Sequence, residues 1–133
     1  MREIRCEERV RKWFAGQGYK VLPKEHFSWN VVAEDGQERW MVEVKGEDLN
    51  AHSDEGELRL AIGEVAGRIT QPDPHAHYAI AVPFTDGYRP ALRRYARSLF
   101  WSQMSVGLIL VSDDWATISF LKPEEVGTWL AKL

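Results

Sequence analysis

The fold prediction depends on residues 40–46, which read WMVEVKG, and on residues 29–36 before them, which read WNVVAEDG. Both stretches alternate apolar and polar side chains, and the Asp-Gly pair between them is a turn signal, so together they predict a β-hairpin. Because side chains alternate faces along a strand, Glu43 and Lys45 share one face. Charged groups are rarely buried unless they are paired or bound to a metal. The acid and the lysine on this otherwise apolar strand therefore indicate a functional site.

Two registers of the hairpin are open. A four-residue loop would place Asn30 directly opposite Glu43. A tight two-residue turn at the Asp-Gly pair would place Asn30 opposite Met41 instead. Both registers have the same parity, so each puts Asn30, Glu43 and Lys45 on one face of the sheet.

The composition bounds the class of protein. A chain of 133 residues with 44% hydrophobic and 28% charged residues is typical of one soluble globular domain, expected to span 1–133. No apolar run approaches the ~20 residues that cross a bilayer, and no signal peptide is visible, so we expect a cytoplasmic protein with no membrane contact. The single cysteine, Cys6, allows no internal disulfide. A net charge of −3 argues against general, charge-driven binding of nucleic acid.

The remaining sequence predicts helices and strands in a mixed order. Helical spacing and end signals indicate helices at residues 4 to about 17, 57–71, 88–101 and 123 to about 133. Besides the hairpin at 28–45, strands are indicated at 19–22, 78–82, 106–111 and 117–121. The run at 78–82 is apolar throughout, which predicts a strand buried on both faces. The resulting order, αβββαβαββα, predicts an α/β domain with a mixed β-sheet flanked by helices.

This order of elements resembles the PD-(D/E)XK nuclease-like superfamily, whose fold is restriction-endonuclease-like. Members carry an acidic residue on the first strand of the hairpin and a Glu/Asp-x-Lys motif on the next strand. Glu43-Val44-Lys45 matches that motif, and Asn30 stands where the acidic residue is usual. A further family pattern on the opening helix is matched by Glu7, Val10, Phe14 and Gly18. Some members also carry a Gly-Gln pair on the helix after the motif strand, where this chain has Gly63-Glu64.

The resemblance implies a nuclease-like DNA-processing protein that hydrolyses a phosphodiester bond with metal assistance. Mg²⁺ or Mn²⁺ would be held by Glu43 and Asn30, because hard cations prefer oxygen ligands. Lys45 would act as the catalytic base or stabilise the transition state, and Glu7 would be a supporting carboxylate of the catalytic set. Asn30 carries no net charge, so it would weaken metal binding relative to a carboxylate. Two active sites are usually needed to cut both strands of a duplex, so a homodimer is one expectation.

A basic ridge supplies a candidate surface for DNA. Arg89, Arg93 and Arg97 are spaced four residues apart within the predicted helix at 88–101, so they would lie on one face and could contact phosphates. A solvated helix face is the plainer reading of the same pattern.

Plainer readings exist for the other residues as well. Glu43 and Lys45 could form an ion pair on a solvated sheet face, and Asn30 could simply form a hydrogen bond within its strand. Glu7 could be a surface charge, and Glu64 could pair with Arg68 one helical turn later. At the level of function, the alternative is a catalytically inactive nuclease-fold protein that serves as a binding or assembly module. A third reading is a domain that binds a small molecule or a protein and keeps the Glu-Lys pair for structure.

Overall fold

A mixed six-stranded sheet forms the centre of the computed structural model, which describes residues 3–24, 28–47, 53–114 and 116–133. The strands lie side by side in chain order. β3, β4 and β5 run parallel to one another, while the other neighbours pair antiparallel. Their bounds are β1 (Lys20–Val21), β2 (Val31–Asp35), β3 (Glu38–Val44), β4 (Ala76–Phe84), β5 (Val106–Ser112) and β6 (Ile118–Leu121).

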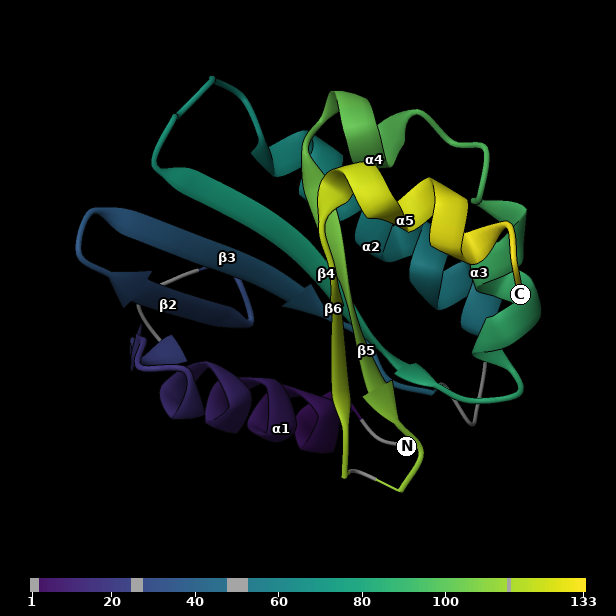
Figure 1. The fold of residues 1–133 in the computed structure, drawn as a ribbon, viewed down its shortest axis with the longest axis horizontal. Coiled ribbons are helices and arrows are strands. Elements are labelled where there is room, and N and C mark those ends of the chain that lie inside the picture. Colours follow the sequence, from purple (N-terminus) through teal and green to yellow (C-terminus); the bar gives the residue numbers. More distant parts are fainter. Residues whose placement is uncertain (1–2, 25–27, 48–52, 115) are drawn as a thin grey trace.

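Helices cover both faces of this sheet (Figure 1). α1 (Glu3–Gly16) packs against one face, where its buried side chains meet those of β2, β3, β4 and β5. The other face is covered by α2 (Asp54–Arg68), α3 (Tyr88–Arg94), α4 (Phe100–Gln103) and α5 (Pro123–Leu130). None of the helices within the described ranges is both long enough and apolar enough to span a bilayer. The predicted α/β fold, a mixed sheet flanked by helices, is confirmed.

Strand alternation divides the buried side chains into two cores. Val42 and Val44 of β3 point toward α1, whereas Met41 and Glu43 point toward α2. β4 contributes to both cores, because its residues from Ala79 to Pro83 are all buried. The prediction that this strand is buried on both faces is therefore confirmed.

The hairpin adopts the first of the two predicted registers. Asp35 lies opposite Glu38 and Val31 opposite Val42, so continuing the register by one residue places Asn30 opposite Glu43. Gly36 in the turn has a φ of 61°, a left-handed conformation that glycine adopts without steric cost. The register is the predicted one, but the prediction that Asn30, Glu43 and Lys45 share one face is wrong for Asn30. Asn30 precedes β2, and its side chain bonds to Glu7 of α1, whereas Glu43 faces α2.

The helix predicted at 88–101 is wrong in its extent. α3 ends at Arg94, and the short α4 begins only at Phe100. The Tyr95 carbonyl accepts a hydrogen bond from the Trp101 indole at 3.1 Å, and the backbone N–H of Phe100 donates to the Ser98 hydroxyl at 3.2 Å. These side-chain bonds replace the backbone bonds that a continuous helix would need.

The interruption also breaks the predicted arginine ridge. Arg89 and Arg93 lie on α3, but Arg97 lies after its end, so the three do not form one helical stripe. Tight packing helps to hold the interruption in place, because a Cβ on Gly127 of α5 would lie only 2.9 Å from the Ala96 carbonyl. Helical spacing in the sequence could not reveal these contacts, which come from distant segments.

Candidate functional site

The centre of the site is the carboxyl end of β3. Glu43 is 4% exposed and faces α2, as the strand parity requires. Lys45 follows directly after β3, and its backbone N–H donates to the Ala81 carbonyl at 2.9 Å, so the strand geometry continues to this residue. The Lys45 ammonium donates to Glu64 Oε1 of α2 at 3.1 Å. The acid and lysine of the motif are therefore brought to one place, and a second carboxylate joins them.

Arg68 links the two carboxylates. Its guanidinium donates to Glu43 Oε2 and to Glu64 Oε2, each at 3.4 Å. The same guanidinium lies 5.0 Å from the centre of the Trp29 ring, which is within the range of a cation–π contact. The pair of Glu64 and Arg68 thus forms as the helical spacing predicted, but it belongs to the site rather than to a solvated helix face.

Protonation is shared unequally between the two carboxylates. Burial raises the pKa of Glu43 to about 8, and the neighbouring Glu64 adds to this rise, while Arg68 and Lys45 oppose it. The pKa of Glu64 is lowered, chiefly because the Glu43 carboxyl donates a hydrogen bond to it. At neutral pH the pair therefore holds one proton, mainly on Glu43.

Lys45 is held in its charged form. Burial alone lowers its pKa, but the hydrogen bond to Glu64 and the charges of Glu64 and Glu43 outweigh that effect and raise the pKa above its usual value. A charged ammonium can donate hydrogen bonds to an anion but cannot accept a proton. This geometry favours the stabilising role over the role of base among the two predicted for Lys45.

Asn30 and Glu7 form a second group beside the first. Asn30 Oδ1 accepts a hydrogen bond from the Val44 N–H at 2.8 Å, and its Nδ2 donates to Glu7 Oε1 at 3.1 Å. Glu7 is 8% exposed, so it is not the surface charge of the plainer reading. It also pairs with Lys24 at 2.8 Å and with Arg11 at 3.5 Å.

The predicted site residues therefore occupy two adjoining groups. Glu43 and Lys45 meet through Glu64, whereas Asn30 contacts Glu7 and the backbone between the motif's acid and lysine. The sequence argument did not identify Arg68, Arg11 or Lys24 as parts of the site. Only the spacing of Glu64 and Arg68, one turn apart on a helix, was a usable signal for any of them.

Oxygen ligands for a hard cation are present in part. Glu43 and Glu64 bring two carboxylates together, which is the donor type that Mg²⁺ prefers. Within residues 3–24, 28–47, 53–114 and 116–133, no group of three or more His, Cys, Asp or Glu residues is arranged to hold a metal. Asn30 Oδ1 already accepts one hydrogen bond, although a carbonyl oxygen has two lone pairs. Its role as a metal ligand stays a prediction.

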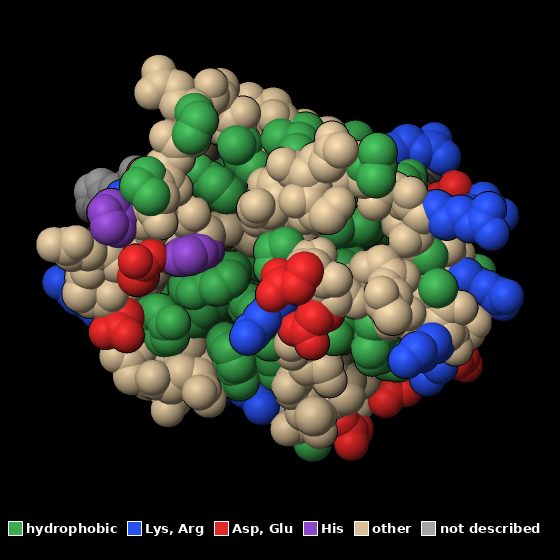
Figure 2. Space-filling view, turned by 45° about the horizontal axis from the view of Figure 1, so that its top comes forward, with side chains coloured by type: hydrophobic (Ala, Val, Ile, Leu, Met, Phe, Trp, Pro, Cys, Tyr) green, Lys and Arg blue, Asp and Glu red, His purple; other side chains and the backbone are tan. Residues whose placement is uncertain are grey.

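The arginine surface begins next to the site. The Tyr88 hydroxyl at the start of α3 donates to the Gly46 carbonyl at 2.7 Å, directly after Lys45. Figure 2 shows basic side chains gathered at the end of the molecule where α3 lies. Arg89, Arg93 and Arg97 are all exposed, and the guanidinium of Arg89 lies 4.3 Å from the centre of the Phe84 ring. Whether these arginines bind DNA stays a prediction.

The element order, the mixed sheet and the helices on both faces define a nuclease-like α/β fold. A similar solved structure is that of an XisH family protein from Nostoc punctiforme PCC 73102, with a TM-score of 0.59 and 18% sequence identity over 87% of this chain and 98% of that one. At this identity the similarity shows the fold alone. The sequence matches no protein-family model and no curated protein, so membership of the PD-(D/E)XK superfamily stays a prediction.

Proposed function

We propose that this protein is a nuclease-like DNA-processing protein that hydrolyses phosphodiester bonds with the help of Mg²⁺ or Mn²⁺. The observation that carries the proposal is the meeting of Glu43, Lys45 and Glu64 at the end of β3, within a nuclease-like fold. Two carboxyl groups and the Lys45 ammonium, partly withdrawn from solvent, are the groups that this reaction needs.

Each residue of the site has a separate role in this proposal. Glu43 and Glu64 would hold the metal, whose chemistry is to activate water and neutralise charge at the phosphate. Lys45, kept charged by its acidic neighbours, would donate a hydrogen bond to a phosphate oxygen. Arg68 orients both carboxylates from α2.

Asn30 and Glu7 are positioning residues in this proposal. Their hydrogen bonds fix the backbone of Val44, which lies between the motif's acid and lysine. Holding this backbone holds both side chains in place, and displacements of about 1 Å cost roughly 100-fold in rate at many catalytic sites.

Cleavage of single- and double-stranded DNA, with and without Mn²⁺, tests the proposal. We expect Lys45→Ala to reduce the metal-dependent rate about 100-fold, because it removes one charged donor from the phosphate. Lys20→Ala, an exposed lysine on β1, is the matched control and should leave the rate unchanged. Equal rates for wild type and Lys45→Ala would contradict the proposal.

A second candidate is an inactive nuclease-fold module that binds DNA or an assembly partner. It is favoured by Asn30 at the usually acidic position, with its oxygen bonded to Val44, and by the contact of Arg68 with Glu43. Under this candidate the protein binds DNA or an assembly partner but shows no metal-dependent cleavage. Calorimetric titration with Mn²⁺ separates both candidates from a domain that keeps the Glu-Lys pair only for structure, which would not bind the metal.

A further inference from the structure

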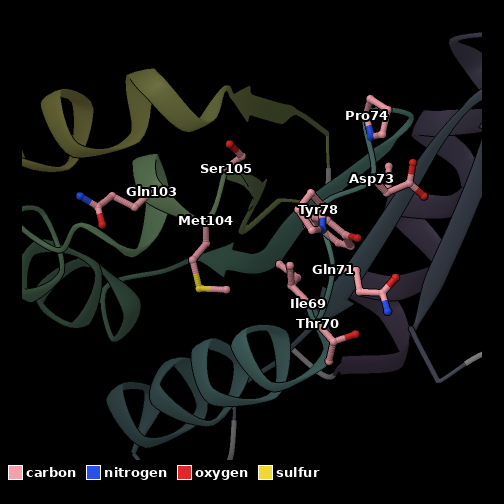
Figure 3. Close-up of a pocket in the computed structure, with 11 residues that line it drawn as sticks. Ile69, Thr70, Gln71, Asp73, Pro74, Tyr78, Gln103, Met104 and Ser105 are labelled. Carbon is pink, nitrogen blue, oxygen red and sulfur yellow. The ribbon is translucent and has the colours of Figure 1, made fainter.

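A cavity of about 530 Å³ opens near the start of β4 and β5. Figure 3 shows Ile69 after α2, Tyr78 on β4 and Met104 after α4 among the side chains that line it. Cavities of a few hundred Å³ are of the size that binds small organic groups. This one is separate from the carboxylates of Glu43 and Glu64, which do not line it.

The lining suits a flat, uncharged group that forms hydrogen bonds. A tyrosine ring, a thioether and an isoleucine supply apolar contact area, and Thr70, Gln71 and other hydroxyl or amide side chains supply polar atoms. No Lys or Arg is found among the described residues that line the cavity, so it offers no cation to an anionic ligand. Its one charged side chain is Asp73, an acceptor that already takes the His75 N–H at 2.9 Å.

Aromatic contacts connect the cavity to the carboxylate site. Trp29 lies between the two, with its ring 5.0 Å from the Arg68 guanidinium and 5.6 Å from the Tyr78 ring. Arg68 contacts Glu43, and the next residue, Ile69, lines the cavity.

Strand register places the two sites close together. Tyr78 pairs with Met41, which precedes Glu43 on the same face of β3, about 7 Å away along the strand. Tyr78 in the cavity wall therefore lies beside the strand that carries Glu43, on the same side of the sheet.

Backbone strain marks the rim of the cavity. Ser105, which lines it, has a φ of 54°, a left-handed conformation that is uncommon for residues other than glycine. Such residues persist where the surrounding structure demands them, often beside ligand sites.

We propose that this cavity receives one unpaired nucleobase of the DNA strand whose phosphate lies at Glu43 and Lys45. The inference rests on the proposed function and adds that the substrate is single-stranded or locally unpaired. A nucleobase offers a flat ring to Tyr78 and Met104 and hydrogen-bonding edges to the amides and to Asp73. Its phosphates stay outside, which agrees with the lack of cationic lining.

Fluorescence anisotropy with a dye-labelled single strand tests this inference. We expect wild type to bind a normal strand about 10-fold more tightly than a wholly abasic strand of the same length. Thr70→Trp, which fills the cavity from an exposed position, should abolish this preference, whereas Thr128→Trp on the exposed side of α5 should retain it. Tyr78→Phe should keep the preference and Tyr78→Ala should lose it, because the ring supplies the stacking surface.

The outcomes separate this inference from the proposed function. A preference that survives Thr70→Trp, or that is absent in wild type, overturns the cavity's role even if DNA is cleaved. A preference that depends on the cavity, without any metal-dependent cleavage, supports the nucleobase site and contradicts the hydrolytic function. The same measurement on Lys45→Ala should show the preference intact, because Lys45 does not line the cavity.

Discussion

Glu38 and Glu43 lie on the same strand, β3, but their surroundings differ completely. The side chain of Glu38 is 47% exposed, and hydrogen bonds first from His77 and then from His75 lower its pKa. The side chain of Glu43 is 5% exposed, and burial next to Glu64 raises its pKa. One end of the strand thus holds a carboxylate, and the other end holds a carboxylic acid at neutral pH. The comparison shows that cover by α2, rather than the residue type, sets the chemistry available at each end.

The largest effect is expected from Glu43→Gln, which replaces the titrating carboxyl group at the buried end of β3. In the metal-free protein, Glu43 keeps its proton up to about pH 8, whereas the unfolded chain loses it near the ordinary value of 4.5. The folded state therefore binds the extra proton in this window, and the free energy of unfolding falls as the pH rises through it. Glu43→Gln cannot lose a proton, so at pH 8.5 we expect it to be more stable than wild type by roughly 3 kcal/mol.

Denaturant unfolding in the presence of a chelator, between pH 5 and 8.5, measures this effect. Glu8→Gln on the exposed side of α1 is the control and should follow the wild-type pH dependence. If Glu43→Gln and wild type lose stability in parallel as the pH rises, Glu43 is ionised in the folded protein and the contrast along β3 disappears.

A smaller effect is expected from Asn30→Asp, which adds a carboxylate beside Glu7, near the buried end of β3. The new group would face Glu7 in place of a donating amide, so we expect a loss of about 2 kcal/mol of stability without metal. Mn²⁺ should stabilise this variant more than wild type, because the added carboxylate beside Glu7 supplies a second charged oxygen donor at that position. Thermal unfolding with and without Mn²⁺ checks both expectations.

Gln37→Glu, in the exposed turn of the same hairpin, adds the same charge away from the site and serves as the control. Equal stabilisation of Asn30→Asp and wild type by Mn²⁺ would remove the argument that Asn30 lies where a metal ligand would act.

The smallest effect is expected at the exposed end. Because its pKa is lowered, Glu38 contributes stability at pH values above its ordinary range, and that contribution is lost as the pH falls through the lowered value. Glu38→Gln should therefore cause only a slight, salt-sensitive loss at pH 6, since the carboxylate is solvated. Thermal unfolding in low and high salt measures it, and a loss as large as that expected for Asn30→Asp would show that exposure does not separate the two ends.

Much of the fold follows from local patterns. Alternation along β2 and β3 was enough to place Glu43 and Lys45 on one face, because a strand has only two faces and the turn preserves parity. An unbroken apolar run identified β4 as buried on both sides. The end of α3 was not predictable in this way, because the Tyr95 carbonyl accepts a hydrogen bond from the Trp101 indole, which belongs to the following helix.

The candidate site was predicted less completely for the same reason. The parity of the hairpin places the backbone of Asn30 correctly but does not fix its side chain, which lies outside β2 and bonds to Val44 and Glu7. Lys24 reaches Glu7 from the loop after β1, and no spacing rule connects those two positions. Hydrogen bonds between side chains from distant segments depend on the tertiary structure, which local sequence patterns do not specify.

The bond from Val44 N–H to Asn30 Oδ1 connects the hairpin to the first helix. The Asn30 side chain, in place of a backbone carbonyl, accepts the hydrogen bond from Val44 beyond the end of the β2–β3 pairing. The same amide donates a hydrogen bond to Glu7 on the first helix. A shift of that helix along its axis would therefore displace the Asn30 amide, and with it the main chain at Val44, between Glu43 and Lys45. The position of the first helix is thereby coupled to the main chain between the acid and the lysine through one amide.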